Sequence, residues 1–112
     1  MLSKKNRLKK GADFKRVFKE GKGFKDGFLF LKIVKNNLGE SRFGFVVGKR
    51  FSKKSFLRNK TKRKLQELVR IEINKIKKKI DGVIIVSPGL GIKNSREIEE
   101  SLGRLFRKSG LL

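Results

Sequence analysis

The sequence predicts a single α+β domain, a two-layer sandwich in which a mostly antiparallel sheet packs against helices. Two observations support this prediction. Short runs of β-branched and aromatic residues alternate along the chain with segments whose apolar residues fall at helical spacing. The chain has 112 residues, which suits one domain, and it contains no repeat or linker. Residues 1–112 are therefore expected to form one unit.

The N-terminal part of the chain is predicted to be an extended basic segment followed by a short helix. Residues 1–10 are rich in lysine and arginine, with Leu2 and Leu8 as possible anchors. Residues 11–20 are predicted to be helical because three apolar side chains share one face at i, i+3 and i+4: Phe14, Val17 and Phe18. Gly21 suits the end of that helix.

Three apolar runs predict strands. The runs 28–34 and 42–48 are separated by a polar turn, so the second strand is most simply antiparallel to the first. The run 83–86 is apolar throughout, which is typical of a strand covered on both faces. The turn-rich stretch 21–27 could hold a short edge strand.

Two further helices complete the predicted order of elements. One should begin near 56–59 and run past Arg70, with an apolar stripe formed by Leu65, Leu68, Val69 and Ile76. The last helix should begin at a cap on Asn94 or Ser95 and continue through Arg107. Its predicted inner face consists of Ile98, Leu102, Leu105 and Phe106.

The charge of the chain indicates a polyanionic partner. The sequence has 32 Lys and Arg against 10 Asp and Glu, a formal net charge of +22, and nucleic acid is the commonest polyanion that such a surface meets. An anionic membrane surface is the rival, but it favours one broad apolar helical face, whereas here apolar residues also form strands. No run approaches the ~20 apolar residues of a membrane span. We expect no membrane partner.

The residue inventory argues against catalysis by the protein itself. There is no His and no Cys, so the usual proton shuttle and thiolate metal ligands are missing. The acidic residues are scattered, apart from Glu97, Glu99 and Glu100 near the start of the last helix, where they complement the helix dipole. We expect no catalytic residue and no metal site in the protein. The lack of Cys and of a secretory signal fits a cytoplasmic location.

The densest basic tract is the main candidate binding site. Nine of the 16 residues in 49–64 are Lys or Arg, and none is acidic. At 100° per residue, one side of the predicted helix gathers Arg58, Asn59, Lys62, Arg63, Gln66 and Arg70. Such a face can bridge phosphates, with arginine binding them in a bidentate manner. The simpler interpretation is a solvated helical face.

The aromatic residues of the first helix allow two interpretations. At helical spacing Phe14 and Phe18 are usually core residues. In a polycation, aromatic side chains at a sheet surface are also where single-stranded RNA stacks. The sequence leaves both interpretations open.

The pattern Arg58-Asn59-x-x-Lys62-Arg63 resembles the Arg-Asn-Arg motif of the bacterial ribonuclease P protein family. Further segments resemble that family in the same order: 6–10, 13–21, 44–50 and 105–108. Two features depart from the family pattern. Gln66 stands where the motif usually has Arg, and the segment 51–57 is one residue longer than usual.

The resemblance implies a fold and a function. The fold has a four-stranded sheet, three helices and a left-handed βαβ crossover, as in ribosomal protein S5 domain 2-like proteins. The function is to assist a catalytic, magnesium-dependent RNA in removing the 5′ leader of precursor tRNA, by binding both the RNA subunit and the leader. A ribosomal protein and a DNA-binding architectural protein remain rivals on charge alone.

The resemblance also implies two sets of site residues. The leader-binding cleft would be lined by Phe14, Phe18 and Leu31. Contacts to the RNA subunit or to the substrate near the cut would come from Lys49, Arg50, Lys53, Lys54, Arg58, Asn59, Lys62, Arg63 and Arg70. From the convergence of basic residues we also expect small anions such as sulfate and phosphate to bind and to favour folding.

Overall fold

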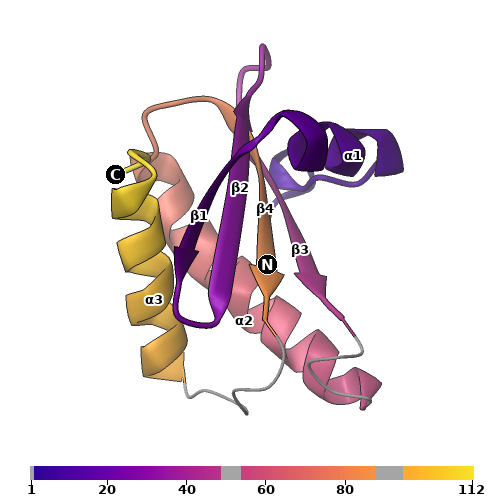
Figure 1. Cartoon of the computed structure of the whole chain (residues 1–112), viewed down its shortest axis with the longest axis vertical. Helices are drawn as coiled ribbons and strands as arrows, with labels where there is room; N and C mark the ends of the chain where they lie inside the picture. Colours follow the sequence, from indigo (N-terminus) through magenta and orange to yellow (C-terminus); the bar gives the residue numbers. More distant parts are fainter. Residues whose placement is uncertain (1, 49–53, 88–94) are drawn as a thin grey trace.

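The computed structural model describes residues 2–48, 54–87 and 95–112. The elements follow the predicted order and are shown in Figure 1. Their bounds are η1 Lys4–Asn6, α1 Gly11–Glu20, β1 Lys22–Asp26, β2 Leu29–Lys35, β3 Arg42–Val47, α2 Ser55–Glu72, η2 Ile73–Lys75, β4 Ile80–Val86 and α3 Ser95–Lys108. The predicted α+β class, the edge strand and the three main helices are confirmed. No helix in these three ranges is long and apolar enough to cross a bilayer.

The sheet has the strand order β1-β2-β4-β3. The strand β4 pairs antiparallel with β2 and parallel with β3, so β2 and β3 run antiparallel to each other, as predicted, but β4 lies between them. The reason is the apolar character of β4, whose residues are almost all buried. A strand that is apolar on both faces belongs in the interior of the sheet, and β3 takes the edge beyond it.

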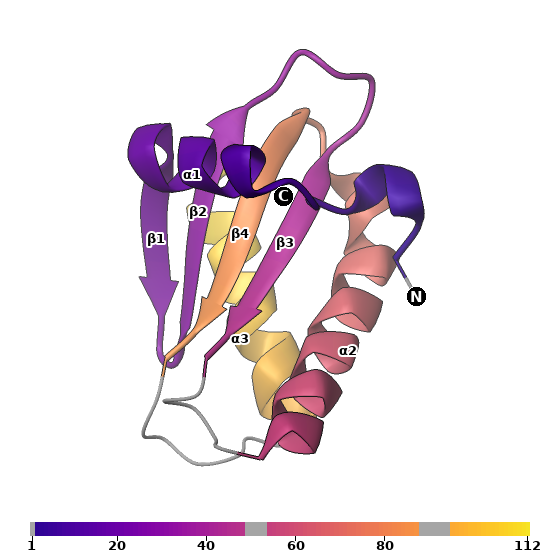
Figure 2. The same ribbon diagram turned by 90° about the vertical axis from the view of Figure 1, so that its right-hand side faces the viewer.

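The connection from β3 through α2 to β4 is left-handed. In Figure 2, α1 lies in front of the sheet and α3 behind it, β3 and β4 both point downward, and β4 lies to the left of β3. Side chains of α2 join the same core cluster as those of α3, so α2 also lies behind the sheet. This hand is opposite to the general preference, and it is the one that the family resemblance implies.

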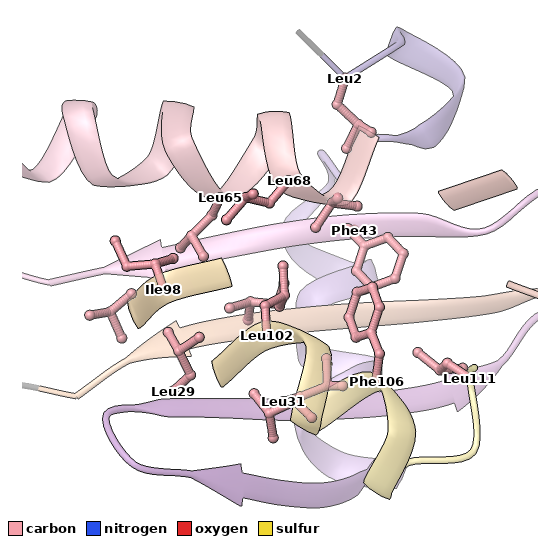
Figure 3. Close-up of a cluster of buried hydrophobic side chains, with 14 of the residues drawn as sticks. Leu2, Leu29, Leu31, Phe43, Leu65, Leu68, Ile98, Leu102, Phe106 and Leu111 are labelled. Atoms are coloured by element: carbon pink, nitrogen blue, oxygen red, sulfur yellow. The ribbon is translucent and has the colours of Figure 1, made fainter. Parts of the chain in front are cut away.

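The sheet and the α2–α3 pair form the two main layers, with the principal core between them. Figure 3 shows this cluster, which includes Phe43 and Phe106 with their rings stacked at 5.7 Å between centroids. The opposite face carries a smaller cluster of Leu8, Val17 and Val83, covered by α1. The sheet face under α2 and α3 is therefore buried more completely than the face under α1, part of which remains exposed.

The N-terminal segment is tied to the sheet edge as a strap. The side chains of Leu2 and Leu8 are buried, which confirms them as anchors. The Leu8 N–H donates to the Phe43 carbonyl at 2.9 Å, and Arg7 forms a parallel bridge with Phe43. In Figure 2 this segment runs from α1 across β3 toward α2. It therefore connects the two sides of the molecule.

Two predicted details differ at the helix ends. The helix α2 ends at Glu72 and is followed by one 3-10 turn, so Ile76 lies beyond the helix, although it is buried in the same core. The helix α3 begins at Ser95, and the predicted cap residue Asn94 lies outside the described residues.

Candidate nucleic-acid interface

The helix α2 has one buried side and one basic side. Its buried residues are Leu65, Leu68 and Val69, which pack into the main core. Arg58 and Lys62 are half-buried, and Asn59 and Arg63 are exposed. None of these four side chains is buried, which agrees with the predicted polar side next to the apolar stripe. Of the other predicted contacts, Lys54 is exposed just before the helix, and Lys49, Arg50 and Lys53 lie outside the described residues.

The C-terminal half of this face is weaker as an anion site. The guanidinium of Arg70 donates through Nε and Nη2 to the Glu67 carboxylate one turn earlier. Gln66 buries its Oε1 atom, for which the described residues provide no hydrogen-bond donor. Arg70 is therefore already paired with an acid, and the Gln66 carbonyl does not face outward. The strongest positive charge lies on the first half of α2.

The two aromatic residues of α1 that were predicted to line the leader-binding cleft lie in different environments. The Phe14 ring contacts the sheet at Gly44, where a Cβ atom would lie 2.4 Å from the tip of the ring. Only a glycine at that position leaves room for the ring. Phe18, one turn later, keeps 39% of its surface exposed. Phe14 thus belongs largely to the core under α1, and Phe18 is available for a ligand.

The prediction that Leu31 faces this cleft is wrong. Leu31 has no exposed surface and points into the main core beneath α3, as Figure 3 shows. Because successive side chains of a strand point to opposite faces, its neighbours Phe30 and Lys32 lie on the α1 side. The Lys32 ammonium donates to the Phe18 carbonyl at 2.7 Å. Lys32 is the one charged residue within the apolar run 28–34. It indicates which face of this strand is less completely buried.

A buried carboxylate holds α1 against the sheet. Asp81 has no exposed surface, and its oxygens accept from Arg42 at 2.9 and 2.6 Å and from the Asn36 amide at 2.8 Å. Arg16 of α1 donates to the same carboxylate at 3.4 Å and to the Lys35 carbonyl at 2.7 Å. Burial alone would raise the pKa of Asp81, but these partners outweigh it and lower that pKa. Asp81 therefore stays charged and fixes the position of α1.

The basic strap provides a third feature that sequence reasoning did not assign to a site. A hollow of about 250 Å³ lies between the strap, α1 and the start of β3. It is lined by Lys4, Lys5, Arg7, Lys9, Lys10, Asp13 and Arg42. Six of these seven residues are cationic. The strap thus extends the positive surface between the cleft and α2.

The acidic residues of the described ranges do not form a metal site. Asp26 is bound by Arg104 and Ser101, and these hydrogen bonds lower the pKa of Asp26. Asp13 pairs with Arg42 at 3.5 Å. Within these ranges no group of three or more His, Cys, Asp or Glu is placed to hold a metal ion. The arrangement can bind anions and aromatic bases.

Comparison with known proteins agrees with this geometry. The family model described as Ribonuclease P matches residues 2–110. The chain belongs to the Ribonuclease P protein family. The ribonuclease P protein component of Clostridium acetobutylicum is 37% identical over 111 residues, covering 97% of this chain and 92% of the relative. That of Alkaliphilus metalliredigens is 36% identical and covers 99% of both chains.

Solved structures of family members have the same fold as this Ribonuclease P family protein. A Staphylococcus aureus RNase P protein mutant with defective mRNA degradation activity superposes with a TM-score of 0.89 at 25% identity, covering 97% of this chain and 92% of that one. The RNase P protein of Thermotoga maritima, solved with 1-(4-fluorophenyl)-2-thiourea, gives a TM-score of 0.83 at 33% identity, covering 91% and 98%. The likeness covers the whole domain.

Proposed function

We propose that this chain is the RNA-binding subunit of a ribonuclease P, which matures precursor tRNA by removing its 5′ leader. The basic face of α2 binds the RNA subunit, and the cleft beside α1 holds the leader. The observation that supports this division is the separation of two chemistries on one molecule. The first half of α2 offers Arg58, Lys62 and Arg63 away from the core, whereas the cleft offers the exposed ring of Phe18.

Leader binding follows from the chemistry of the cleft. Single-stranded RNA presents unstacked bases, and stacking on an aromatic ring is worth about 1–3 kcal/mol per base. Phe18 keeps 39% of its surface exposed, and the Lys32 ammonium lies at its carbonyl. Phe30 is half-buried on the same face of the sheet. An extended strand with bases on these rings and phosphates near lysine is the substrate that this cleft fits.

Cleavage chemistry is assigned to the RNA subunit. Magnesium, which that RNA would hold, supplies charge stabilisation and an activated water for phosphodiester hydrolysis. The carboxylates of Asp13, Asp26 and Asp81 are each engaged by arginine, so they do not fit a magnesium site. The role of this chain is to bind and position RNA. We place this work in the cytoplasm, because a chain without cysteine needs no oxidising compartment.

A competition experiment tests the proposal against the rival of a DNA-binding architectural protein. The protein is bound to the RNA subunit of a bacterial ribonuclease P, and unlabelled structured RNA or duplex DNA of matched phosphate content is added. We expect RNA to displace the probe at much lower concentration than DNA. Equal displacement by duplex DNA would mean that general charge attraction explains the binding.

A further inference from the structure

A second lysine cluster lies at the opposite end of α2 from the basic face proposed to bind the RNA subunit. Lys77, Lys78 and Lys79 follow η2 and precede β4, and all three are exposed. From Arg63, the last residue of that face, to the end of α2 at Glu72 is nine residues of helix, or about 14 Å at 1.5 Å per residue. Figure 1 shows the link from α2 to β4 arching over the top of the molecule, beyond the far end of α2. One phosphate cannot touch both surfaces.

The backbone under these lysines is held firmly. Ile76 and Ile80 on either side are buried in the core. The Lys78 carbonyl accepts from the Ser41 hydroxyl at 2.9 Å, and the Lys79 carbonyl accepts from the Asn36 N–H at 3.1 Å. Three ammonium groups are therefore presented on a fixed support. A solvated charge run on a loose loop would not be anchored in this way.

Little negative charge compensates this cluster. Acids close to the cluster in the sequence or in the neighbouring hollow are already paired, Glu72 with Lys75 at 3.7 Å, Asp81 with Arg42 at 2.6 Å and Glu40 with Lys5 at 3.9 Å. Acids of the described residues form no ion pair with Lys77, Lys78 or Lys79. The Lys78 ammonium lies near Gly110, past the C-terminal end of α3, where the helix dipole is negative. That contact explains the placement of Lys78 and leaves the other two charges unexplained.

A hollow beside the cluster adds hydrogen-bond donors. Lys79 and Lys5 line a polar hollow of about 210 Å³ together with Asn6 and Asn74. Glu40 also lines it, with its Oε2 atom buried and 3.9 Å from the Lys5 ammonium. Ammonium and amide groups are the donors that contact phosphate and sugar oxygens in RNA complexes. Lys79 thus joins the lysine cluster to a hollow that carries further hydrogen-bond donors.

We propose that Lys77, Lys78 and Lys79 form a second RNA-contact surface, which binds phosphates of a segment different from the one that α2 contacts. The protein then contacts two RNA segments that are held at least about 14 Å apart. This inference rests on the proposed function, because it assigns RNA as the partner. The phosphates could belong to the RNA subunit or to precursor tRNA.

The test replaces all three lysines with glutamine in the full chain. Affinity for the RNA subunit alone, and affinity of the assembled complex for precursor tRNA, are each measured across a salt series. We expect one of the two affinities to weaken and its log–log salt slope to flatten by about 0.7–0.9 per lost phosphate contact. The affinity that changes identifies the source of the phosphates. Arginine at all three positions should restore both slope and affinity.

A matched control removes the same charge elsewhere. Lys15→Gln, Lys19→Gln and Lys25→Gln together also take three exposed charges from the surface, and should change the slope clearly less. If both triple variants give the same change, net charge explains the effect and the proposal is wrong. It is also wrong if neither RNA affinity changes and only binding to anionic phospholipid vesicles is lost. Glutamine removes charge repulsion, so the melting temperature should not fall.

Failure of this inference can be separated from failure of the proposed function. The Arg58→Ala, Lys62→Ala and Arg63→Ala variant is measured in parallel. If that variant loses affinity and the Lys77–Lys79 variant does not, α2 binds RNA and the second surface does not exist. If the α2 variant binds RNA normally, the proposed function of α2 is wrong, whatever the lysine cluster does. Because the sites are far apart, their effects should add in the combined variant.

Discussion

Asp81 is the residue on which the geometry of the cleft depends most. It is fully buried, yet it is bound by two arginines and an amide from three different parts of the chain. Removing one partner of a buried ion pair typically costs about 3–5 kcal/mol. Since Arg42 keeps some contact with solvent and with Asp13, we expect Asp81→Asn to lie near the lower end of that range.

The same residue predicts an acid limit to stability. The pKa of Asp81 is lowered from its ordinary value of 3.8, so the folded state binds this proton less readily than the unfolded chain. The stability that the charged form contributes is present above about pH 4 and is lost as pH falls toward the folded pKa. Urea unfolding from pH 7 downward should show this decline, and Asp81→Asn should reduce it. An unchanged decline in the variant would contradict the assignment.

Phe18 and Phe14 predict different outcomes for the same substitution. Phe18→Ala should leave the fold intact and weaken binding of precursor tRNA more than of mature tRNA, by about 1–3 kcal/mol for one lost stack. Phe14→Ala should also destabilise the protein, because the Phe14 ring fills the space above Gly44. Circular dichroism with affinities for both tRNA forms separates the two effects. Equal loss for precursor and mature tRNA in Phe18→Ala would rule out leader binding at this position.

The face of the sheet to which Leu31 points could not be predicted from the sequence. A run that is apolar at nearly every position does not reveal which residues face which side. The pairing of β2 with its neighbouring strands determines which face Leu31 points to. Leu31 lies opposite Phe24 and Ile84, which both contact the main core. In contrast, Leu2, Leu8 and the basic residues of α2 could be predicted from spacing and charge alone.

The helix α2 has a strongly basic first half and a second half in which Arg70 is paired with Glu67. The two halves therefore predict a different dependence of RNA binding on salt concentration. Replacing Arg58, Lys62 and Arg63 with alanine should weaken binding to the RNA subunit and flatten the salt slope by up to about 0.9 per lost contact, less on irregular RNA. Arg70→Ala is the matched control, because Glu67 already pairs with Arg70. Weakening without any change of slope would mean that the three residues stabilise the helix and do not contact phosphates.

The order of the strands in the sheet could not be predicted from local sequence patterns. The positions of the helices and strands followed from periodicity and turn residues, and α1 begins and ends as predicted, but β4 begins at Ile80, before the predicted run 83–86. The pairing of β3 with β4 depends on a contact between residues nearly 40 positions apart. The polar turn 36–41 predicts that β2 and β3 run antiparallel, but it does not reveal that the buried strand β4 lies between them. The left-handed crossover came from the family resemblance, because the general rule favours the other hand.

At the scale of the whole molecule, the net charge of +22 couples folding to anions. Folding concentrates positive charge in the α2 face and the strap hollow, so the native state should bind anions better than the unfolded chain. A ligand at a hundred times its dissociation constant stabilises by about 2.7 kcal/mol. Millimolar sulfate, phosphate or nucleotides should therefore raise the melting temperature clearly, and part of the population should be unfolded in dilute buffer without polyvalent anions.

Screening alone would also stabilise a polycation, so the control is sodium chloride at matched ionic strength. Equal stabilisation by chloride and sulfate would remove the need for specific anion sites. A protein that is fully folded and insensitive to both salts would refute the coupling. If the coupling holds, the RNA subunit is the natural polyanion that completes folding.

Leader removal at low magnesium tests the central claim most directly. The RNA subunit of a bacterial ribonuclease P is incubated with precursor tRNA at a magnesium concentration where the RNA alone cuts slowly, with and without this protein. The account predicts faster removal of the 5′ leader when the protein is present, and no cleavage by the protein alone. A folded protein that gives no stimulation would contradict the claim that this chain assists the catalytic RNA.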